Sequence, residues 1–251
     1  MKIILSLVTV ILLSIQPLMA ADTTSPWPEI RKQRIAKLLP NALKAAGVDA
    51  WLVICRENNN DPLADHIGCE NAGGTASFLF YHDQDGFHSL AFSPSSEATA
   101  LDDMDVHDTV ISVDRSLSTV SEAAKFIIEK DFAKIAVNSS PNNAQADGLS
   151  YTQRLTLEAA LGNHANRLVS SEDVVYEWLS IKLPAEVDIM RKAAVITAAW
   201  EVEAYKQIIP GVSTDADIAK FLKAKMAEAG VEDAWAPDQN PNVNSGPDRG
   251  H

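Results

Sequence analysis

Histidines are the side chains of this sequence best suited to proton transfer, because the imidazole pKa lies near neutrality. The sequence contains six, and five of them lie in polar loops or in the arms of an expected hairpin: His66, His82, His88, His107 and His164. At such positions a solvated histidine with no chemical role is the ordinary case. The sixth, His251, follows a turn-rich segment, and from the residues alone it is typical of a frayed terminus.

Cys55 and Cys69 are the only cysteines. In an oxidising compartment they could form a disulfide, which would stabilise the fold by about 3 kcal/mol in the chain-entropy model. Alternatively, Cys55 is a buried thiol at the end of an apolar strand. Both interpretations stay open, because the sequence does not fix the distance between the two Cα atoms. No Cys-x-x-Cys or His-x-x-x-His spacing is present, so a zinc site is not expected.

The segment that leads to His251 has the pattern of two helices and a turn-rich tail. The first helix is expected to begin at Pro184, and its apolar residues recur every three or four positions up to Ile208. Pro210-Gly211 ends this pattern. Thr214 and Asp217 then form a capping box for a second helix, which Gly230 ends. We therefore expect a pair of amphipathic helices before the tail.

The preceding region alternates strands with helices. The apolar run 50–55 predicts a strand buried on both faces, and Pro40 predicts a break within the helical pattern 30–46. Asp85-Gly86 predicts a hairpin turn between two strands. The remaining expected elements are strands at 106–113 and 134–137 and helices at 121–130 and 151–161. This alternation predicts an α/β fold with a mixed sheet and a domain boundary near Ser180.

Several of these pieces, in this order, resemble the creatinase, prolidase and aminopeptidase P superfamily, the "pita-bread" metallopeptidases. The matching segments are 47–53 with 56–58, then 182–186 with 191–193, then 209–214, and finally 243–246 running to His251. The resemblance implies a creatinase-type N-terminal α/β domain at 27–180. It further implies that 181–251 is the start of a C-terminally truncated pita-bread catalytic domain.

The same resemblance implies a chemistry. His251 corresponds to an active-site histidine that shuttles protons or donates a hydrogen bond to the tetrahedral centre, without binding metal. The family hydrolyses the peptide bond before proline with two divalent ions (manganese, cobalt or zinc). Their ligands are two aspartates, a histidine and two glutamates that follow this position. The chain is therefore expected to be an inactive fragment of an Xaa-Pro peptidase that binds no metal itself.

Two other functions remain possible at this point. The chain could be a non-catalytic periplasmic module for binding or dimerisation. It could also belong to a metal-free amidinohydrolase that resembles creatinase and uses a histidine as its base. A peptide substrate is expected only for a full-length form, and a homodimer is possible.

The first twenty residues have the pattern of a secretory signal peptide. Lys2 precedes an apolar stretch, and Ala20 closes a cleavage site of small residues. A retained anchor is the alternative. Removal of Lys2 would change the formal net charge from −13 to −14, and such an acidic protein is not expected to bind nucleic acid or anionic membranes. We expect a periplasmic or secreted protein.

Overall fold

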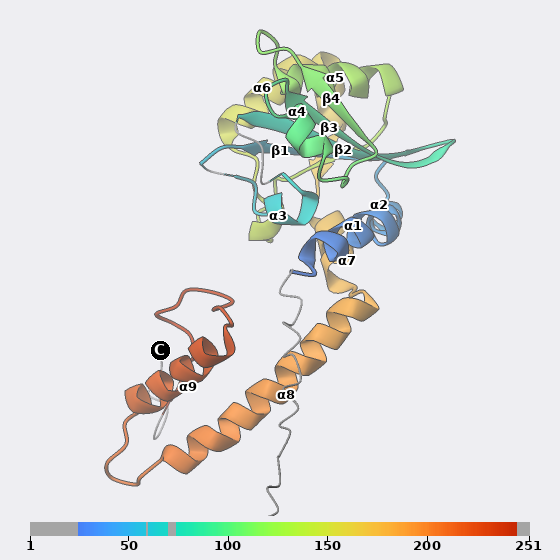
Figure 1. Ribbon diagram of the computed structural model, residues 1–251. Coiled ribbons are helices and arrows are strands. Elements are labelled where there is room, and N and C mark those ends of the chain that lie inside the picture. Colours follow the sequence, from blue (N-terminus) through green and yellow to red (C-terminus); the bar gives the residue numbers. More distant parts are fainter. Residues whose placement is uncertain (1–24, 59, 70–73, 245–251) are drawn as a thin grey trace, which may run out of the picture.

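The computed structural model describes residues 25–58, 60–69 and 74–244 (Figure 1). Two expectations lie outside these residues: the signal peptide at 1–20 and the active-site histidine His251. Among the described residues, no helix has both the length and the apolar character needed to cross a bilayer.

A six-stranded mixed sheet forms the centre of the molecule, with strand order β4-β3-β2-β1-β5-β6. β1 pairs antiparallel with β2 and parallel with β5, so it is a central strand. β3 extends the sheet antiparallel to β2, and β4 and β6 join as parallel strands at the two edges. The strands are β1 (Ala50–Arg56), β2 (Thr75–Asp83), β3 (Gly86–Pro94), β4 (Thr109–Val113), β5 (Ile135–Val137) and β6 (Leu168–Ser170). The expected α/β fold with a mixed sheet is confirmed.

Helices cover both faces of this sheet, which explains why β1 is apolar throughout. Trp51, Val53 and Cys55 pack on one face against α1 (Trp27–Lys37), α2 (Leu39–Ala46) and α7 (Glu172–Ser180). The alternate residues of β1 pack on the other face against α5 (Thr119–Lys130) and α6 (Tyr151–Leu161). Figure 1 shows α5 and α6 above the sheet and α1, α2 and α7 below it. Because side chains alternate along a strand, one apolar run contributes to both cores.

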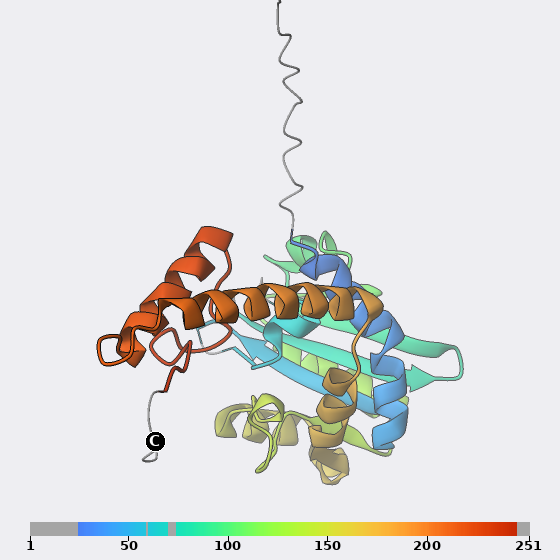
Figure 2. The ribbon, with the colours of Figure 1, turned by 90° about the horizontal axis from the view of Figure 1, so that it is seen from below.

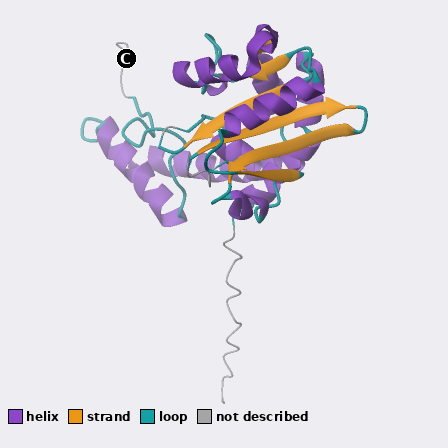
Figure 3. Ribbon diagram, turned by 90° about the horizontal axis from the view of Figure 1, so that it is seen from above, coloured by secondary structure: helices purple, strands orange, loops and turns teal. Residues whose placement is uncertain are grey.

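Short helices complete the α/β domain, and Figure 3 shows the sheet between its helical layers. They are α3 (Ala64–Ile67), α4 (Ala98–Asp102) and the 3₁₀ turns η1 (Ala144–Ala146) and η2 (Gly162–Arg167). The break expected near Pro40 lies at Leu38, between α1 and α2. Pro40 has no N–H to donate to Ala36 O and lies in the first turn of α2, so the helical pattern is interrupted just before that turn.

The hairpin differs from the sequence-based expectation by one position. Asp83 pairs with Gly86, so the two-residue loop is Gln84-Asp85 and not Asp85-Gly86. Gly86 has φ +128° and is the first residue of β3. The glycine is thus used for its backbone freedom at the strand entry. β4 is also shorter than the expected strand 106–113, because it begins at Thr109.

Two helices extend from this domain as an arm, which we define as residues 184–244. α8 (Pro184–Gln207) leads away from the sheet, and α9 (Asp215–Ala229) returns beside it (Figure 1). Figure 2 shows the same pair from below. α8 ends at Gln207, so Ile208 lies outside the helix to which the apolar pattern assigned it.

Candidate functional site

A cavity lies between α8, α9 and the segment 231–244 that follows them. It has a volume of about 750 Å³. Ala204 and Ile218 are buried at its floor, while Trp200, Leu222 and Met226 are half-buried. We call this cavity the arm groove. The segment 231–244 that closes this groove leads directly to the part of the sequence that contains His251.

Local sequence signals position α9. Thr214 Oγ1 accepts from Asp217 N (3.2 Å), and the Asp217 carboxylate accepts from Thr214 N (3.0 Å). This is the expected capping box, and Gly230 ends the helix in the left-handed conformation as expected (φ +65°). The Lys225–Glu203 ion pair (2.8 Å) then joins α9 to α8. The hydrogen bond from Thr214 lowers the pKa of Asp217.

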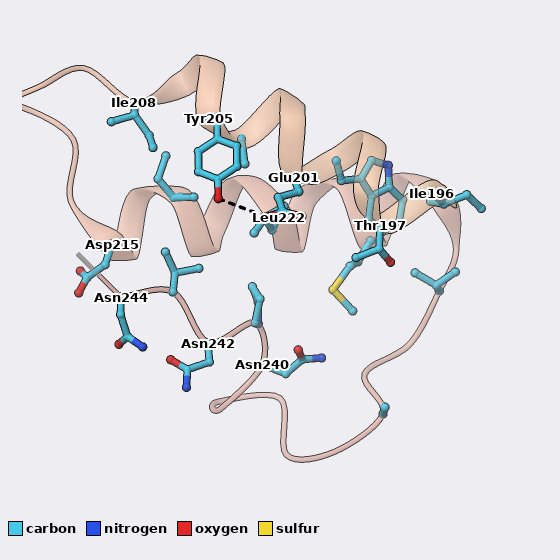
Figure 4. A pocket seen from close by; sticks show the side chains of 18 of the residues that line it. Ile196, Thr197, Glu201, Tyr205, Ile208, Asp215, Leu222, Asn240, Asn242 and Asn244 are labelled. Atoms are coloured by element: carbon cyan, nitrogen blue, oxygen red, sulfur yellow. Dashed lines mark hydrogen bonds between the residues drawn. The ribbon is translucent and has the colours of Figure 1, made fainter. Parts of the chain in front are cut away.

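The polar groups around the arm groove lie at its edges. Figure 4 shows Asn240, Asn242 and Asn244 along the segment that closes the groove. Tyr205 donates a hydrogen bond to Glu201 Oε1 (3.2 Å) on the side of α8. Asp233 accepts hydrogen bonds from Lys223 (2.5 Å) and Asn240 (2.8 Å), which anchors the closing segment to α9. Because the lining between these edges is mainly apolar, the groove is suited to covering apolar surface.

The two hairpin histidines point to opposite faces of the sheet, because His82 pairs with Phe87 and His88 pairs with Tyr81. His82 Nε2 lies 2.9 Å from Pro40 O, and His88 Nε2 lies 2.9 Å from Asp83 Oδ1. His88 also stacks on Tyr81, with ring centroids 4.9 Å apart. Both rings have structural partners in the α/β domain and neither lines the arm groove.

His107 is not the solvated histidine that its sequence context suggested. It is 8% exposed, its Nδ1 lies 2.7 Å from Ser89 Oγ, and its ring packs against Phe78 and Phe80. Burial lowers its pKa to about 4. His66 packs edge-on against Trp27 and Trp178, and burial lowers its pKa as well. His164 lies 3.5 Å from Asp131 at the domain surface.

The structure pairs Cys55 with Cys69 in a disulfide, with a Cα–Cα distance of 6.6 Å. Both residues are buried, at the end of β1 and just after α3. Of the two interpretations left open by the sequence, the bridged form is the one found. As disulfide sulfurs, they do not serve as thiolate ligands for a metal.

The residues described here do not fit a two-metal centre. In the ranges 25–58, 60–69 and 74–244, no three histidine, cysteine, aspartate or glutamate side chains converge as metal ligands.

A buried polar network, which sequence reasoning missed, lies at the carboxyl ends of β5 and β6, beside β1. Asn138 Nδ2 donates to both carboxylate oxygens of Asp61 (2.9 Å each), and Asn138 Oδ1 accepts from Trp51 Nε1 (2.8 Å) and Ser171 Oγ (2.7 Å). A Cβ atom on Gly148 would lie 2.0 Å from Asp61 Oδ2, so only glycine fits there. Burial raises the pKa of Asp61. The positions of Asn138 and Ser171, each directly after a short strand, were the available signal.

Comparison with known proteins shows which solved structures have a similar fold. No protein-family model and no curated protein matches the chain by sequence. Among solved structures, an Xaa-Pro dipeptidase from Bacillus anthracis matches 79% of this chain at 19% identity with a TM-score of 0.51. An X-Pro aminopeptidase from Thermotoga maritima MSB8 (75% of this chain, 18% identity, TM-score 0.48) and the dipeptidase PepE from Mycobacterium ulcerans (79%, 19%, 0.49) also match.

This chain spans about half the length of those solved structures: 49% of the first two and 50% of the third. At these identities the similarity is one of fold. The chain has a mixed α/β fold like that of the Xaa-Pro dipeptidase, which is consistent with the creatinase-type N-terminal domain that the sequence resemblance implied.

Proposed function

We propose that this chain is the N-terminal α/β domain and the first two catalytic-domain helices of an exported Xaa-Pro peptidase, of the aminopeptidase P or prolidase type. The observation that carries the proposal is the fold shared with the Xaa-Pro dipeptidase over 79% of this chain. That match extends beyond the α/β domain, since residues 27–180 alone are a smaller share of the chain. The order of a proline-initiated helix, a capped second helix and a tail containing His251 supports the same assignment.

In this proposal His251 shuttles a proton to or from the reacting peptide, or donates a hydrogen bond to the tetrahedral centre. Two divalent ions would supply the attacking hydroxide. The family resemblance implies that their ligands belong to sequence that follows His251. The arm groove then serves to pack α8 and α9 against that sequence, and the 251-residue chain alone is inactive.

The proposal places the protein in the periplasm or outside the cell. The disulfide between Cys55 and Cys69 supports this location, because disulfides persist in oxidising compartments. The acidic net charge of −13 supports a partner that is neither nucleic acid nor an anionic membrane. The partners that we propose are a peptide substrate for the full-length enzyme and a second copy of the same chain.

The first test is to sequence the gene past codon 251, where the proposal expects codons for two aspartates, a histidine and two glutamates. A stop codon would instead favour a non-catalytic binding or dimerisation module. The extended chain should hydrolyse Ala-Pro, with Pro-Ala as the control substrate, and should need added manganese, cobalt or zinc.

Two variants assign the residues of this reaction. His251→Ala in the extended chain should lower kcat by about 10²-fold or more while metal content stays unchanged. The 251-residue chain should show no turnover with any of the three metals. Turnover by that short chain, or metal-independent turnover by the extended one, would contradict the proposal.

A further inference from the structure

One buried ion pair connects the α/β domain to the beginning of the arm. Arg34 on α1 is 2% exposed, and its Nη1 donates to both oxygens of Glu186 (2.9 and 2.7 Å). Glu186 lies in the first turn of α8 and is 16% exposed. The same carboxylate also accepts a hydrogen bond from Leu183 N (2.7 Å), so it caps α8 while it binds Arg34.

The guanidinium of Arg34 binds the residues on the chain before α8 as well. Its Nη1 donates to Ile181 O (3.0 Å), and its Nη2 donates to Trp178 O (2.5 Å). Trp178 returns a hydrogen bond from its indole Nε1 to Arg34 O (3.2 Å), and its ring lies 5.5 Å from the Arg34 guanidinium carbon. One planar side chain therefore binds the end of α7, the connection after it and the first turn of α8.

The arm has little other contact with the domain near this point. Every α8 side chain from 188 to 199 is exposed. The exposed set includes the large apolar residues Ile189, Met190, Val195 and Ile196. The direction in which α8 leaves the domain is thus determined within residues 178–187, where the Arg34 contacts converge.

We infer that Arg34 is a positioning residue that sets the direction of the arm, and with it the place of the arm groove relative to the sheet. The fork of a guanidinium matches a carboxylate and neighbouring carbonyls in a fixed geometry, which a single ammonium does not reproduce. This inference is independent of the proposed peptidase activity, because it concerns how two parts of the chain are joined.

Stability and direction can be separated experimentally. Removing one partner of a buried ion pair leaves an uncompensated charge, whereas replacing both partners with apolar residues of similar volume can be nearly neutral. Arg34→Met should therefore lower the melting temperature, and the double variant Arg34→Met/Glu186→Met should recover much of that loss. If Arg34 sets the direction, the double variant still loses the fixed orientation of the arm.

Electron–electron distance measurements between two spin labels report that orientation directly. Labels at Glu129→Cys on α5 and Ala224→Cys on α9 lie on the two sides of the Arg34–Glu186 ion pair, and both positions are exposed. The two native cysteines are bonded to each other, so the introduced thiols are the reactive ones. The parent chain should give a narrow distance distribution. Arg34→Met and the double variant should give distributions roughly twofold broader or more, as expected for a released hinge.

Arg31→Met is the matched control. Arg31 is also buried on α1, but its carboxylate partner, Asp65 at 3.8 Å, belongs to the α/β domain. This variant should keep the narrow distribution even where it loses stability. A double variant as narrow as the parent, or an Arg31→Met variant as broad as Arg34→Met, would overturn the inference. If Arg34→Met does not fold, the double variant decides alone.

Discussion

At the scale of single residues, burial has opposite effects on two titratable groups of the α/β domain. His107 lies between Phe78 and Phe80, and burial disfavours its charged form, which lowers its pKa. Asp61 lies beside Asn138 at the carboxyl ends of β5 and β6, and burial raises its pKa because it disfavours the charged carboxylate. Their contributions to the pH dependence of folding therefore have opposite signs.

His107 should make the fold sensitive to acid. Its pKa is about 4 in the folded chain against the ordinary histidine value of 6.5, so the unfolded state binds the proton first as the pH falls below 6.5. The stability contributed by the neutral ring is then lost until the pH reaches the folded pKa. Between pH 7.5 and pH 4 this loss is about 3 kcal/mol.

Urea denaturation of the parent and of His107→Gln over this pH range measures that loss. Between pH 7.5 and pH 4, the variant should lose about 3 kcal/mol less of its free energy of unfolding than the parent does. His164→Gln controls for the removal of one imidazole from the unfolded chain. Parallel pH profiles for the parent and His107→Gln would contradict the assignment.

Asp61 should make the fold less stable as the pH rises, which is opposite to the effect of His107. Because its folded pKa is raised, its favourable contribution is complete below the unfolded pKa of about 3.8 and is lost as the pH rises through the folded pKa. Asp61→Asn removes the buried charge and keeps an oxygen for Leu63 N and Asn138 Nδ2. At pH 7 it should raise the free energy of unfolding, and at pH 3 that gain should vanish.

The exposed Asp147, on the neighbouring loop, gives the matched variant Asp147→Asn, which makes the same change in net charge. Comparing the two variants by urea denaturation at pH 7 and pH 3 separates burial from net charge. An Asp61→Asn variant that is less stable than the parent at pH 7 yet equal to it at pH 3 would show that the ionised carboxylate stabilises the fold.

Neither of these two residues could have been recognised from the sequence. Asp61 and Asn138 are 77 positions apart, and His107 and Ser89 are 18 apart, so their contacts exist only after the sheet has formed. A polar residue in a loop is usually solvated, and no local pattern distinguishes the buried exceptions. His251 was singled out by resemblance, and its role stays a prediction.

At the scale of elements, the features that depend on a few consecutive residues were predicted correctly. The capping box of Thr214 and Asp217 and the left-handed Gly230 depend on four or five consecutive residues. The predicted position of the hairpin loop was wrong by one residue, because the pairing of Asp83 with Gly86 depends on the register of the whole strand pair. The apolar pattern of α8 predicted a helix correctly, but it could not predict which of its side chains would be buried.

The capping box gives a prediction for α9. Thr214→Ala removes the oxygen that accepts from Asp217 N, which should cost about 1 kcal/mol of helix stability. Hydrogen exchange should show roughly fivefold faster exchange of amides within 215–229, because α9 has few tertiary contacts to compensate. Thr156→Ala on α6, where the hydroxyl donates to Thr152 O, is the matched control. Unchanged protection of α9 would show that packing against α8 dominates.

The disulfide joins two other elements, the end of β1 and the residues after α3. It bridges positions 14 apart in sequence. Constraint of the unfolded chain by a loop of this size stabilises the fold by about 3 kcal/mol in the entropy model. Reduction should therefore lower the melting temperature of the parent. A Cys55→Ala/Cys69→Ala variant should already have a lowered melting temperature and should not respond to the reductant. Equal melting temperatures with and without reductant in the parent would contradict this.

At the scale of the whole molecule, apolar side chains are distributed unevenly between the domain and the arm. Two buried clusters fill the two faces of the sheet. The arm contributes most of the exposed large apolar residues: Ile189, Met190, Val195, Ile196, Val202, Tyr205, Ile208, Ile209, Val212, Val231 and Trp235. Full burial of each such aliphatic side chain would be worth about 1.5–3 kcal/mol. Burial of apolar side chains therefore stabilises the α/β domain much more than it stabilises the arm.

This distribution predicts that the α/β domain unfolds as an independent unit. A chain lacking residues 188–251 keeps both cores and the Arg34–Glu186 joint. Its free energy of unfolding should lie within about 1 kcal/mol of the longer chain's, because α8 beyond residue 187 buries few side chains against the domain. Calorimetry should give one transition for the short chain at the main transition temperature of the longer one. Limited trypsin digestion of the longer chain should cut first at the exposed Lys206 and leave residues 27–180 intact. A short chain that unfolds several degrees lower, or an arm that resists trypsin in the monomer, would show that the arm stabilises the domain.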